Sequence, residues 1–255
     1  MFSLLIIHVL YLQGITEDKL LINRQEIILC EGTDYQTNAY LFSSQQSEPA
    51  IMIIAGAHGD EIAGIEAAKK ILDNFKLEKG TVIFIPEANK LAVDNHVRAI
   101  TPDEDLNRHY PGDVTQEGVI RLAGEIFSVM EENNVIFLLD LHESTDYYQN
   151  NETSFGQTIV IDDMDHTFLL EISHLLAESL NESIVLPQNL FQVIEAPIEG
   201  SSTYESLRKY NIPGITFETC TLINLKKRIK LHSYCIQYIL DYFDIIQNQE
   251  VEIIY

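Results

Sequence analysis

Short apolar runs rich in β-branched residues alternate along this chain with stretches of helical periodicity, and this alternation constrains the fold more than any other feature. Such alternation is typical of α/β proteins, in which helices cover a largely parallel or mixed sheet. Residues 50–55 and 135–141 are almost entirely apolar, which indicates strands buried on both faces. We therefore expect an α/β fold with a central mixed, mostly parallel sheet flanked by helices.

The expected elements follow one another closely. An antiparallel hairpin within residues 20–45 opens the chain, because strand-like segments at 26–30 and 38–42 flank a turn-rich stretch. Residues 226–255 are expected to form a helix and a final strand at VEIIY. Residues 89–111 are loop-rich, and a long irregular segment in a compact domain usually has a function. Further strands are expected at 81–85, 157–161 and 215–218, and helices at 61–79, 119–133, 168–180 and 203–210.

Length and composition indicate one domain spanning residues 1–255. The chain has 255 residues, and 46% of them are hydrophobic, which is ample for a sizeable core. It has no apolar run of about 18 residues, no repeat and no low-complexity tract. Membrane-spanning, solenoid and disordered classes are therefore excluded.

The formal net charge is −23, from 39 acidic and 16 basic residues. This charge repels nucleic acids and anionic membrane surfaces, so we expect neither as a partner. An anionic substrate would need a local cluster of arginines. The three cysteines, Cys30, Cys220 and Cys235, have no CxxC spacing and are expected to be buried free thiols.

Residues 1–13 are apolar enough to resemble the core of a signal peptide. They lack the preceding basic residues and the small-residue cleavage site of such a peptide. We therefore expect a cytoplasmic protein whose first segment belongs to the core. Export with a cleaved amino terminus is the alternative.

Two histidines and a glutamate form a candidate metal site. A catalytic zinc needs three nitrogen or oxygen ligands and one open position. His58 lies in a glycine turn after strand 50–55, and Glu61 three residues later opens a helix, so both side chains can reach one point. His142 follows strand 135–141, and adjacent parallel strands end at the same edge of a sheet. A structural role for these histidines is the alternative at this stage.

Four ordered motifs make the comparison with a known family specific. They are GAHGDE at 56–61, DLNR at 105–108 followed by YPG, DLH at 140–142, and Phe217-Glu218. Their order and spacing over residues 51–219 resemble the succinylglutamate desuccinylase/aspartoacylase family, within the zinc carboxypeptidase-like hydrolases. The resemblance implies a zinc carboxypeptidase-like fold and one bound zinc ion.

The resemblance also implies roles for individual residues. His58, Glu61 and His142 resemble the zinc ligands, and Glu218 resembles the general base that takes a proton from the attacking water. Asp105 is expected to accept a hydrogen bond from the second ring nitrogen of a ligand histidine, which fixes its tautomer. A helix cap or surface ion pair is the alternative for Asp105.

The remaining matches concern the substrate. Arg98 resembles the arginine that polarises the scissile carbonyl, and Asn107 and Arg108 resemble the pair that binds a substrate carboxylate. Tyr204 and Arg208 have a spacing from Glu218 similar to that of a substrate-contacting pair in aspartoacylases. One helical turn separates them, so they share a helix face, although a solvated position is equally open for Arg208.

The chain departs from the family after Glu218. Aspartoacylases continue with a β-rich domain that covers the active site, whereas only a short segment follows Glu218 here. We expect that cover to be missing and the site to be more open, with specificity coming from loops such as 146–155. The narrow acyl-aspartate and succinylglutamate activities are therefore not transferred.

These observations favour a zinc-dependent hydrolase that cleaves the amide bond of an N-acyl amino acid or related small carboxylate. A metallocarboxypeptidase that acts on peptides or cell-wall stem peptides is the first alternative. A non-catalytic metal-binding protein on the same scaffold is the second. Zinc is itself an expectation, because sites of two histidines and one glutamate also accept cobalt, manganese or iron. The sequence does not indicate an oligomeric state.

Overall fold

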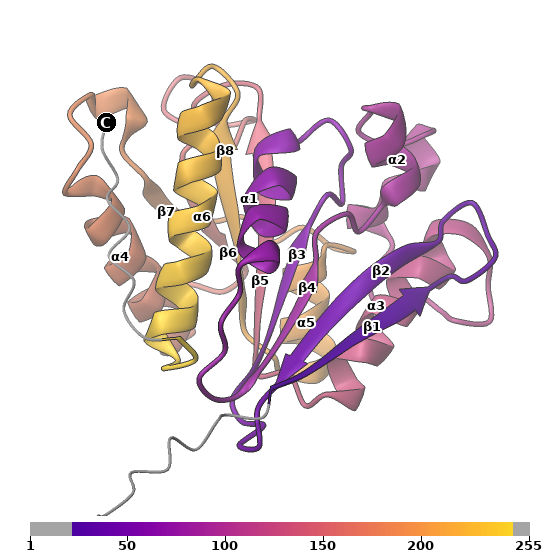
Figure 1. The fold of residues 1–255 in the computed structure, drawn as a ribbon. Helices are drawn as coiled ribbons and strands as arrows, with labels where there is room; N and C mark the ends of the chain where they lie inside the picture. Colours follow the sequence, from indigo (N-terminus) through magenta and orange to yellow (C-terminus); the bar gives the residue numbers. More distant parts are fainter. Residues whose placement is uncertain (1–21, 247–255) are drawn as a thin grey trace, which may run out of the picture.

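A computed structural model describes residues 22–246, which form a mixed sheet with helices on both faces (Figure 1). The strands of this part of the chain are β1 (Asn23–Leu29), β2 (Thr37–Ser43), β3 (Ala50–Ala55), β4 (Thr81–Ile85), β5 (Phe137–Ser144), β6 (Thr158–Ile161), β7 (Gln192–Glu195) and β8 (Gly214–Cys220). The helices are α1 (Ile62–Asp73), α2 (Lys90–Asn95), α3 (Gly118–Glu132), α4 (Thr167–Asn181), α5 (Ser202–Tyr210) and α6 (Leu225–Tyr242). Short 3-10 helices lie at Pro102–Glu104, Leu106–Arg108 and Pro187–Asn189.

The strands are arranged in the order β1-β2-β4-β3-β5-β8-β6-β7. The central four, β4, β3, β5 and β8, run parallel, and the β1–β2 hairpin joins them antiparallel at one side. On the other side, β6 pairs antiparallel with β8 and parallel with β7. The expected α/β class, the mostly parallel sheet and the opening hairpin are thus confirmed. Since β3, β5 and β8 are parallel neighbours, their carboxyl ends meet at one edge.

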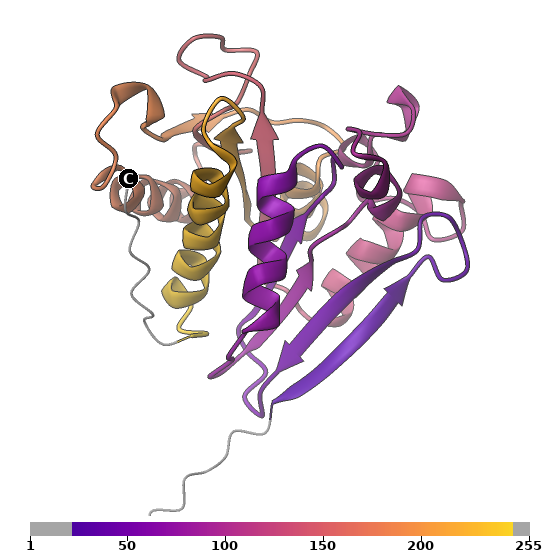
Figure 2. The ribbon, with the colours of Figure 1, turned by 45° about the horizontal axis from the view of Figure 1, so that its top comes forward.

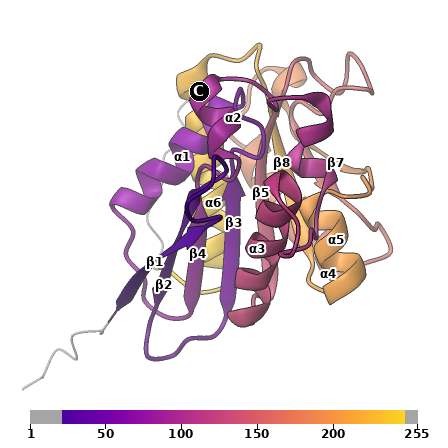
Figure 3. The same cartoon turned by 90° about the vertical axis from the view of Figure 1, so that its right-hand side faces the viewer.

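Helices α1 and α6 lie side by side on one face of the sheet (Figures 1 and 2), and α3 and α5 cover the opposite face (Figure 3). Strand β3 serves both layers because its side chains alternate between faces. Ile51 and Ile53 belong to the core beneath α1, α4 and α6, whereas Met52 and Ile54 belong to the core beneath α3. Every residue of β3 is buried, as its apolar sequence predicts.

Helix α1 ends at Asp73, so the expectation that it runs to residue 79 is wrong. The apolar residues after Asp73 are buried by packing against other elements and not as part of the helix. The Phe75 ring packs edge-on against Phe42 and Phe84, at centroid distances of 5.1 and 5.0 Å, and Leu77 is 3% exposed. The peptide nitrogen of Glu78 donates to the carbonyl of Ile245, 3.0 Å away. Tertiary packing therefore takes this segment out of the helix.

Other boundaries also differ from expectation. The loop-rich segment 89–111 contains α2 and two 3-10 helices, and strand β7 was not anticipated. Strands β5 and β8 continue to Ser144 and Cys220, so His142 and Glu218 lie inside strands near their carboxyl ends. The expected strand at 251–255 and the apolar segment 1–13 lie outside the described residues. The assignment of the whole chain to one domain stays a prediction.

The structure also bears on the cysteines and on the expected lack of a membrane-spanning segment. Cys30, Cys220 and Cys235 are free and buried, as expected. Among the described helices, none has the length and apolar character needed to cross a membrane.

Candidate metal centre and active site

The turn between β3 and α1 places the first two candidate ligands. A side chain at Gly59 would put its Cβ atom 2.0 Å from the carbonyl oxygen of Ala92 in α2, so only glycine fits there. Gly56 adopts a φ of +70°, which also favours glycine. The turn therefore packs directly on α2. His58 lies between these glycines, and Glu61 is the residue immediately before α1.

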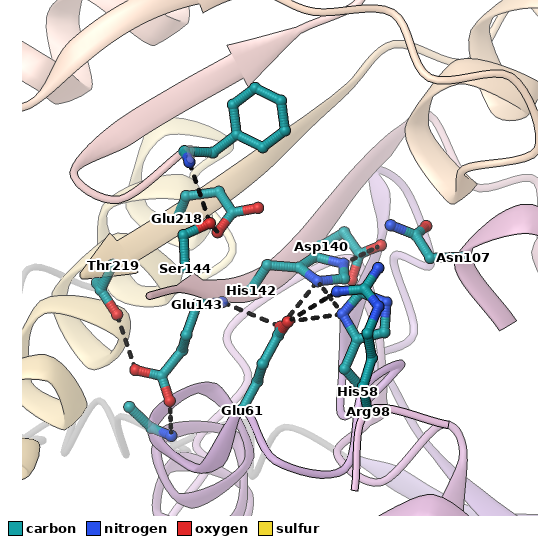
Figure 4. A network of polar contacts seen from close by, with 12 residues as sticks. His58, Glu61, Arg98, Asn107, Asp140, His142, Glu143, Ser144, Glu218 and Thr219 are labelled. Atoms are coloured by element: carbon teal, nitrogen blue, oxygen red, sulfur yellow. Dashed lines mark hydrogen bonds and ion pairs between the residues drawn. The ribbon is translucent and has the colours of Figure 1, made fainter. Parts of the chain in front are cut away.

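His58, Glu61 and His142 bring their polar atoms together at the carboxyl edge of the sheet (Figure 4). The Nδ1 atom of His58 lies 2.6 Å from Oε1 of Glu61, and the Nδ1 atom of His142 lies 2.9 Å from Oε2. The two Nδ1 atoms are 3.2 Å apart. All three residues are buried, and one ligand atom from each lies within 4.8 Å of the others. This donor set and its spacing fit a single metal ion.

The other ring nitrogen of each histidine faces a carboxylate. The Nε2 atom of His58 lies 3.0 Å from Oδ1 of Asp105, and the Nε2 atom of His142 lies 3.2 Å from Oδ2 of Asp140. A carboxylate at Nε2 favours the tautomer with the proton on that nitrogen, which leaves Nδ1 free to bind a metal. Asp105 thus lies where its predicted role requires. Asp140 was missed, although residues two apart on a strand share a face.

The buried charges balance within this cluster. Burial opposes the charged form of His142, but Asp140 and Glu61 outweigh it and raise the pKa of His142 well above its ordinary value. Burial also opposes ionisation of Glu61, but the two histidines lower the pKa of its carboxyl far below the usual range. Asp105, paired with His58 and Arg98, has a lowered pKa as well. Three carboxylates around two imidazoles attract positive charge, either protons or a metal ion.

Arg98 lies beside His58 and Glu61 (Figure 4). Its Nε and Nη2 atoms donate to Oδ2 of Asp105 at 3.2 and 2.9 Å, and its Nη1 atom is 3.8 Å from Oε1 of Glu61. Half of its side chain is exposed, so the guanidinium can meet a molecule that enters from solvent.

Asn107 and Arg108 follow on the same segment. Asn107 is buried, and its Oδ1 atom accepts a hydrogen bond from the peptide nitrogen of Ser202 at 3.3 Å. Arg108 is exposed and donates from Nη1 to the carbonyl of Asn107 at 2.6 Å. The peptide nitrogen of Asn107 donates to Oδ1 of Asp105 at 3.0 Å, the same oxygen that faces His58. Contacts of Asn107 and Arg108 with substrate stay a prediction.

Glu218 lies directly opposite His142 in the pairing of β5 with β8. It is buried, and its Oε2 atom accepts a hydrogen bond from the Ser144 hydroxyl at 3.1 Å. The same hydroxyl accepts from the peptide nitrogen of Phe155, also at 3.1 Å, which ties the loop 146–155 to this carboxylate. Burial, aided by the charge of Glu61, raises the pKa of Glu218 to about 7. A carboxylate with this pKa is suited to exchange protons near neutral pH.

Tyr204 and Arg208 share a face of α5, as predicted. The guanidinium carbon of Arg208 lies 5.6 Å from the centre of the Tyr204 ring, in a cation–π contact. Arg208 is exposed, and its charge acts on the nearby Asp162. Within residues 22–246, Tyr204 and Arg208 contact each other and not the three candidate ligands. Their contact with substrate stays a prediction.

A second polar network behind the ligands was not anticipated. The Thr219 hydroxyl lies 3.1 Å from Oε1 of Glu143 and 3.0 Å from Nε2 of His232, and Arg228 forms an ion pair with Glu143. No local motif indicates this network. Arg228 and His232 reach it only because α6 packs beside α1.

The fold is that of the zinc carboxypeptidase-like class. The family model described as the succinylglutamate desuccinylase/aspartoacylase catalytic domain matches residues 47–221. The chain therefore belongs to the succinylglutamate desuccinylase/aspartoacylase family, as its motifs predict.

One curated relative is the N-alpha-acetyl-L-2,4-diaminobutyric acid deacetylase of Halomonas elongata. It is 28% identical over 176 residues, which cover 62% of this chain and 51% of the relative. The chain thus spans about half the length of this relative.

Solved structures that share the fold include proteins from two bacteria. The cell shape determinant protein Csd4 of Helicobacter pylori has a TM-score of 0.72 at 19% identity, over 91% of this chain and 57% of Csd4. Csd4 is described as a D,L-carboxypeptidase in its mDAP-bound form. An aspartoacylase family protein of Mesorhizobium loti has a TM-score of 0.65 at 19% identity, over 91% of this chain and 70% of that chain. At these identities the likeness establishes the fold alone.

Proposed function

We propose that this protein is a zinc-dependent hydrolase that cleaves the amide bond of an N-acyl amino acid or a related small carboxylate. The convergence of His58, Glu61 and His142 beside the buried carboxylate of Glu218 supports this function most directly. Family membership and the deacetylase relative agree with it.

The metal would be held by the Nδ1 atoms of His58 and His142 and the carboxylate of Glu61. A zinc ion there would act as a Lewis acid toward the acyl carbonyl and would make water more acidic. Asp105 and Asp140 hold the two imidazoles in the tautomer that this binding requires. The donor types favour zinc among the common metals, and the ligand count leaves a position open for reaction.

Glu218 is the proposed general base. With a pKa of about 7, its carboxylate is partly ionised at neutral pH and can take the proton of the attacking water. The same carboxyl group can then protonate the leaving amine. Ser144 orients it through the hydrogen bond at Oε2.

The arginines account for recognition of an anionic substrate by a strongly acidic protein. Arg98 is proposed to stabilise the negative charge that develops on the carbonyl oxygen, since its half-exposed guanidinium lies next to Glu61. Asn107 and Arg108 are proposed to bind the substrate carboxylate, with Tyr204 and Arg208 as further contacts. The loop 146–155, which is tied to Ser144 at Phe155, is the proposed source of acyl-group specificity.

The test is hydrolysis of a panel of N-acyl amino acids by protein reconstituted with zinc. We expect activity that is lost on chelation, restored by zinc, and lowered by about 10²–10⁴-fold by Glu218→Gln. A matched control is Glu125→Gln, which alters a carboxylate on α3 that accepts hydrogen bonds from the Cys30 nitrogen and from Arg121 rather than from the ligand set. Activity that survives both chelation and Glu218→Gln would contradict the proposal.

The same assay separates the alternatives. Release of a terminal residue from peptides or stem peptides, with N-acyl amino acids inert, would favour a metallocarboxypeptidase. The fold that this chain shares with Csd4 is compatible with that outcome. A purified protein that holds no metal, and whose stability is unchanged by His58→Ala, would favour a non-catalytic role.

A further inference from the structure

Glu143 follows the ligand His142 in β5 but points to the other face of the sheet, toward α1 and α6 (Figure 4). Its side chain is 0% exposed. One carboxylate oxygen accepts a hydrogen bond from the peptide nitrogen of Ala63 at 2.8 Å. The other accepts from the Thr219 hydroxyl at 3.1 Å and from the Arg228 guanidinium. The family motifs include none of these three contacts.

These contacts hold the start of α1, where Glu61 lies. Glu61 precedes the helix, and its own side chain makes no cap hydrogen bond to it. The free peptide nitrogens of a first helical turn need acceptors, and an anion there also complements the helix dipole. The carboxylate of Glu143 meets both needs at Ala63. In addition, the peptide nitrogen of Glu143 donates directly to Oε2 of Glu61 at 3.0 Å. Glu143 thus holds Glu61 through its backbone and through the helix.

Arg228 makes the burial of Glu143 possible. Its side chain is 12% exposed, and its Nε atom donates to the carbonyl of Ile223 at 2.8 Å, which aims the guanidinium at Glu143. A buried carboxylate without a partner is costly, the more so beside other carboxylates such as Glu61. If Arg228 is removed, we expect Glu143 to turn toward solvent and to release the start of α1.

We propose that Glu143 and Arg228 are positioning residues for the ligand Glu61, and that they set the affinity with which His58, Glu61 and His142 bind a divalent cation. The inference rests on the metal site of the proposed function. It adds that Arg228 of α6 stabilises this site through Glu143. Neither residue is among the proposed metal ligands or substrate contacts.

The test measures metal binding rather than hydrolysis. The full chain is stripped with a chelator and titrated with Zn²⁺ against a chromophoric competitor, and then with Co²⁺ while the visible absorption bands are recorded. These bands report coordination geometry, which a merely structural role would not change. The variants are Glu143→Gln, Arg228→Met and Arg228→Lys.

Arg121→Met is the matched control. Arg121 donates from Nε to Oε1 of Glu125 at 2.6 Å, and Glu125 accepts a hydrogen bond from the Cys30 nitrogen at 2.6 Å. This pair therefore has the same chemistry as the Arg228–Glu143 pair, but it holds Cys30 after β1 rather than the start of α1.

We expect Glu143→Gln and Arg228→Met to weaken zinc binding by about tenfold to hundredfold and to change the cobalt spectrum, as removal of support behind a ligand usually does. Arg228→Lys keeps the charge and is expected to recover part of the affinity. Arg121→Met is expected to leave zinc affinity and cobalt spectrum unchanged, even if its melting temperature falls.

Folded Glu143→Gln protein with wild-type zinc affinity and cobalt spectrum would overturn the inference. If Arg228→Met does not fold, Glu143→Gln and Arg228→Lys decide. The single amide oxygen of the first can accept from Ala63 or from Arg228 but not from both, and the second retains the positive charge. Wild-type protein that binds zinc without hydrolysing N-acyl amino acids would contradict the proposed function but not this inference. Wild-type protein that binds no zinc would contradict both.

Discussion

The two candidate ligand histidines have similar surroundings. Each turns Nδ1 toward Glu61 and Nε2 toward an aspartate, Asp105 for His58 and Asp140 for His142. Asp140 is fully buried, and the Ser202 hydroxyl donates to it from the start of α5. The orientation of each ring therefore depends on a residue that is not itself a ligand.

Replacement of Asp140 by asparagine should lower zinc affinity by about tenfold to hundredfold, because an amide no longer favours the required tautomer of His142. Competitive zinc titration measures the change. Asp162→Asn is the control, since Asp162 is also buried and accepts a hydrogen bond from Thr203 of α5. Equal zinc affinity in the two variants would rule out this role for Asp140.

The pH dependence of hydrolysis should follow Glu218. Its pKa is raised to about 7 by burial and by Glu61, and a general base must be ionised. As pH falls through this pKa the carboxylate gains a proton, so kcat/KM should fall on the acid side. A bound cation would move this limb to lower pH. Glu218→Gln should lower kcat by about 10²–10⁴-fold while zinc binding persists. An acid limb that is unchanged in the residual activity of this variant would assign the titration to another group.

At the scale of elements, the strand–turn–helix unit β3–α1 supplies two ligands, and α2 fixes its turn. Parallel pairing of β3, β5 and β8 brings the third ligand and Glu218 to the same edge. The close approach of Gly59 to Ala92 joins the turn to the segment that continues to Arg98 and Asp105. The ligands and the groups around them are thus assembled from β3, α1, α2, β5 and β8.

Gly59→Ala tests this junction. The added methyl group would overlap the main chain of α2, so either the turn or the helix must move. We expect a loss of stability of about 1–3 kcal/mol, together with weaker zinc binding. Thermal unfolding of the metal-free protein and zinc titration measure the two effects. Unchanged values in both would show that the contact between the turn and α2 is adaptable.

At the scale of the whole molecule, a net charge of −23 surrounds a site that is itself rich in carboxylates. This field favours a cation at the ligands and opposes anions elsewhere. Three arginines lie near the site: Arg98 and Arg108 are exposed, and Arg228 is mostly covered and paired with Glu143.

His232 links the buried network to global stability. Burial lowers its pKa to about 3, with help from the charges of Arg228 and His142, so it stays neutral in the folded protein. In the unfolded chain its pKa is about 6.5, so below that pH the unfolded state gains a proton that the folded state does not. This contribution to stability is present above about pH 6.5 and is lost as pH falls toward 3.

At pH 5.5, protonation of His232 in the unfolded chain should lower the free energy of unfolding by about 1 kcal/mol. This pH lies above the isoelectric point near 4.5, so the protein keeps its negative net charge. His232→Gln should remove this part of the pH dependence. Denaturant unfolding of the wild type and the variant at pH 7.5 and 5.5 measures it. Parallel pH dependence in the two proteins would show that His232 is accessible to protons in the folded state.

The α/β class, most strands and helices, and the residues that meet at the candidate metal site could be predicted from the sequence. Local periodicity sufficed for the elements, whereas the ligand set also depended on the glycine turn around His58 and on the four ordered motifs of the family. Three features follow only from packing in the folded protein: α1 ends at Asp73, Asp140 faces His142, and Arg228 reaches Glu143. These features depend on contacts between segments far apart in the chain, and burial there outweighs local preference.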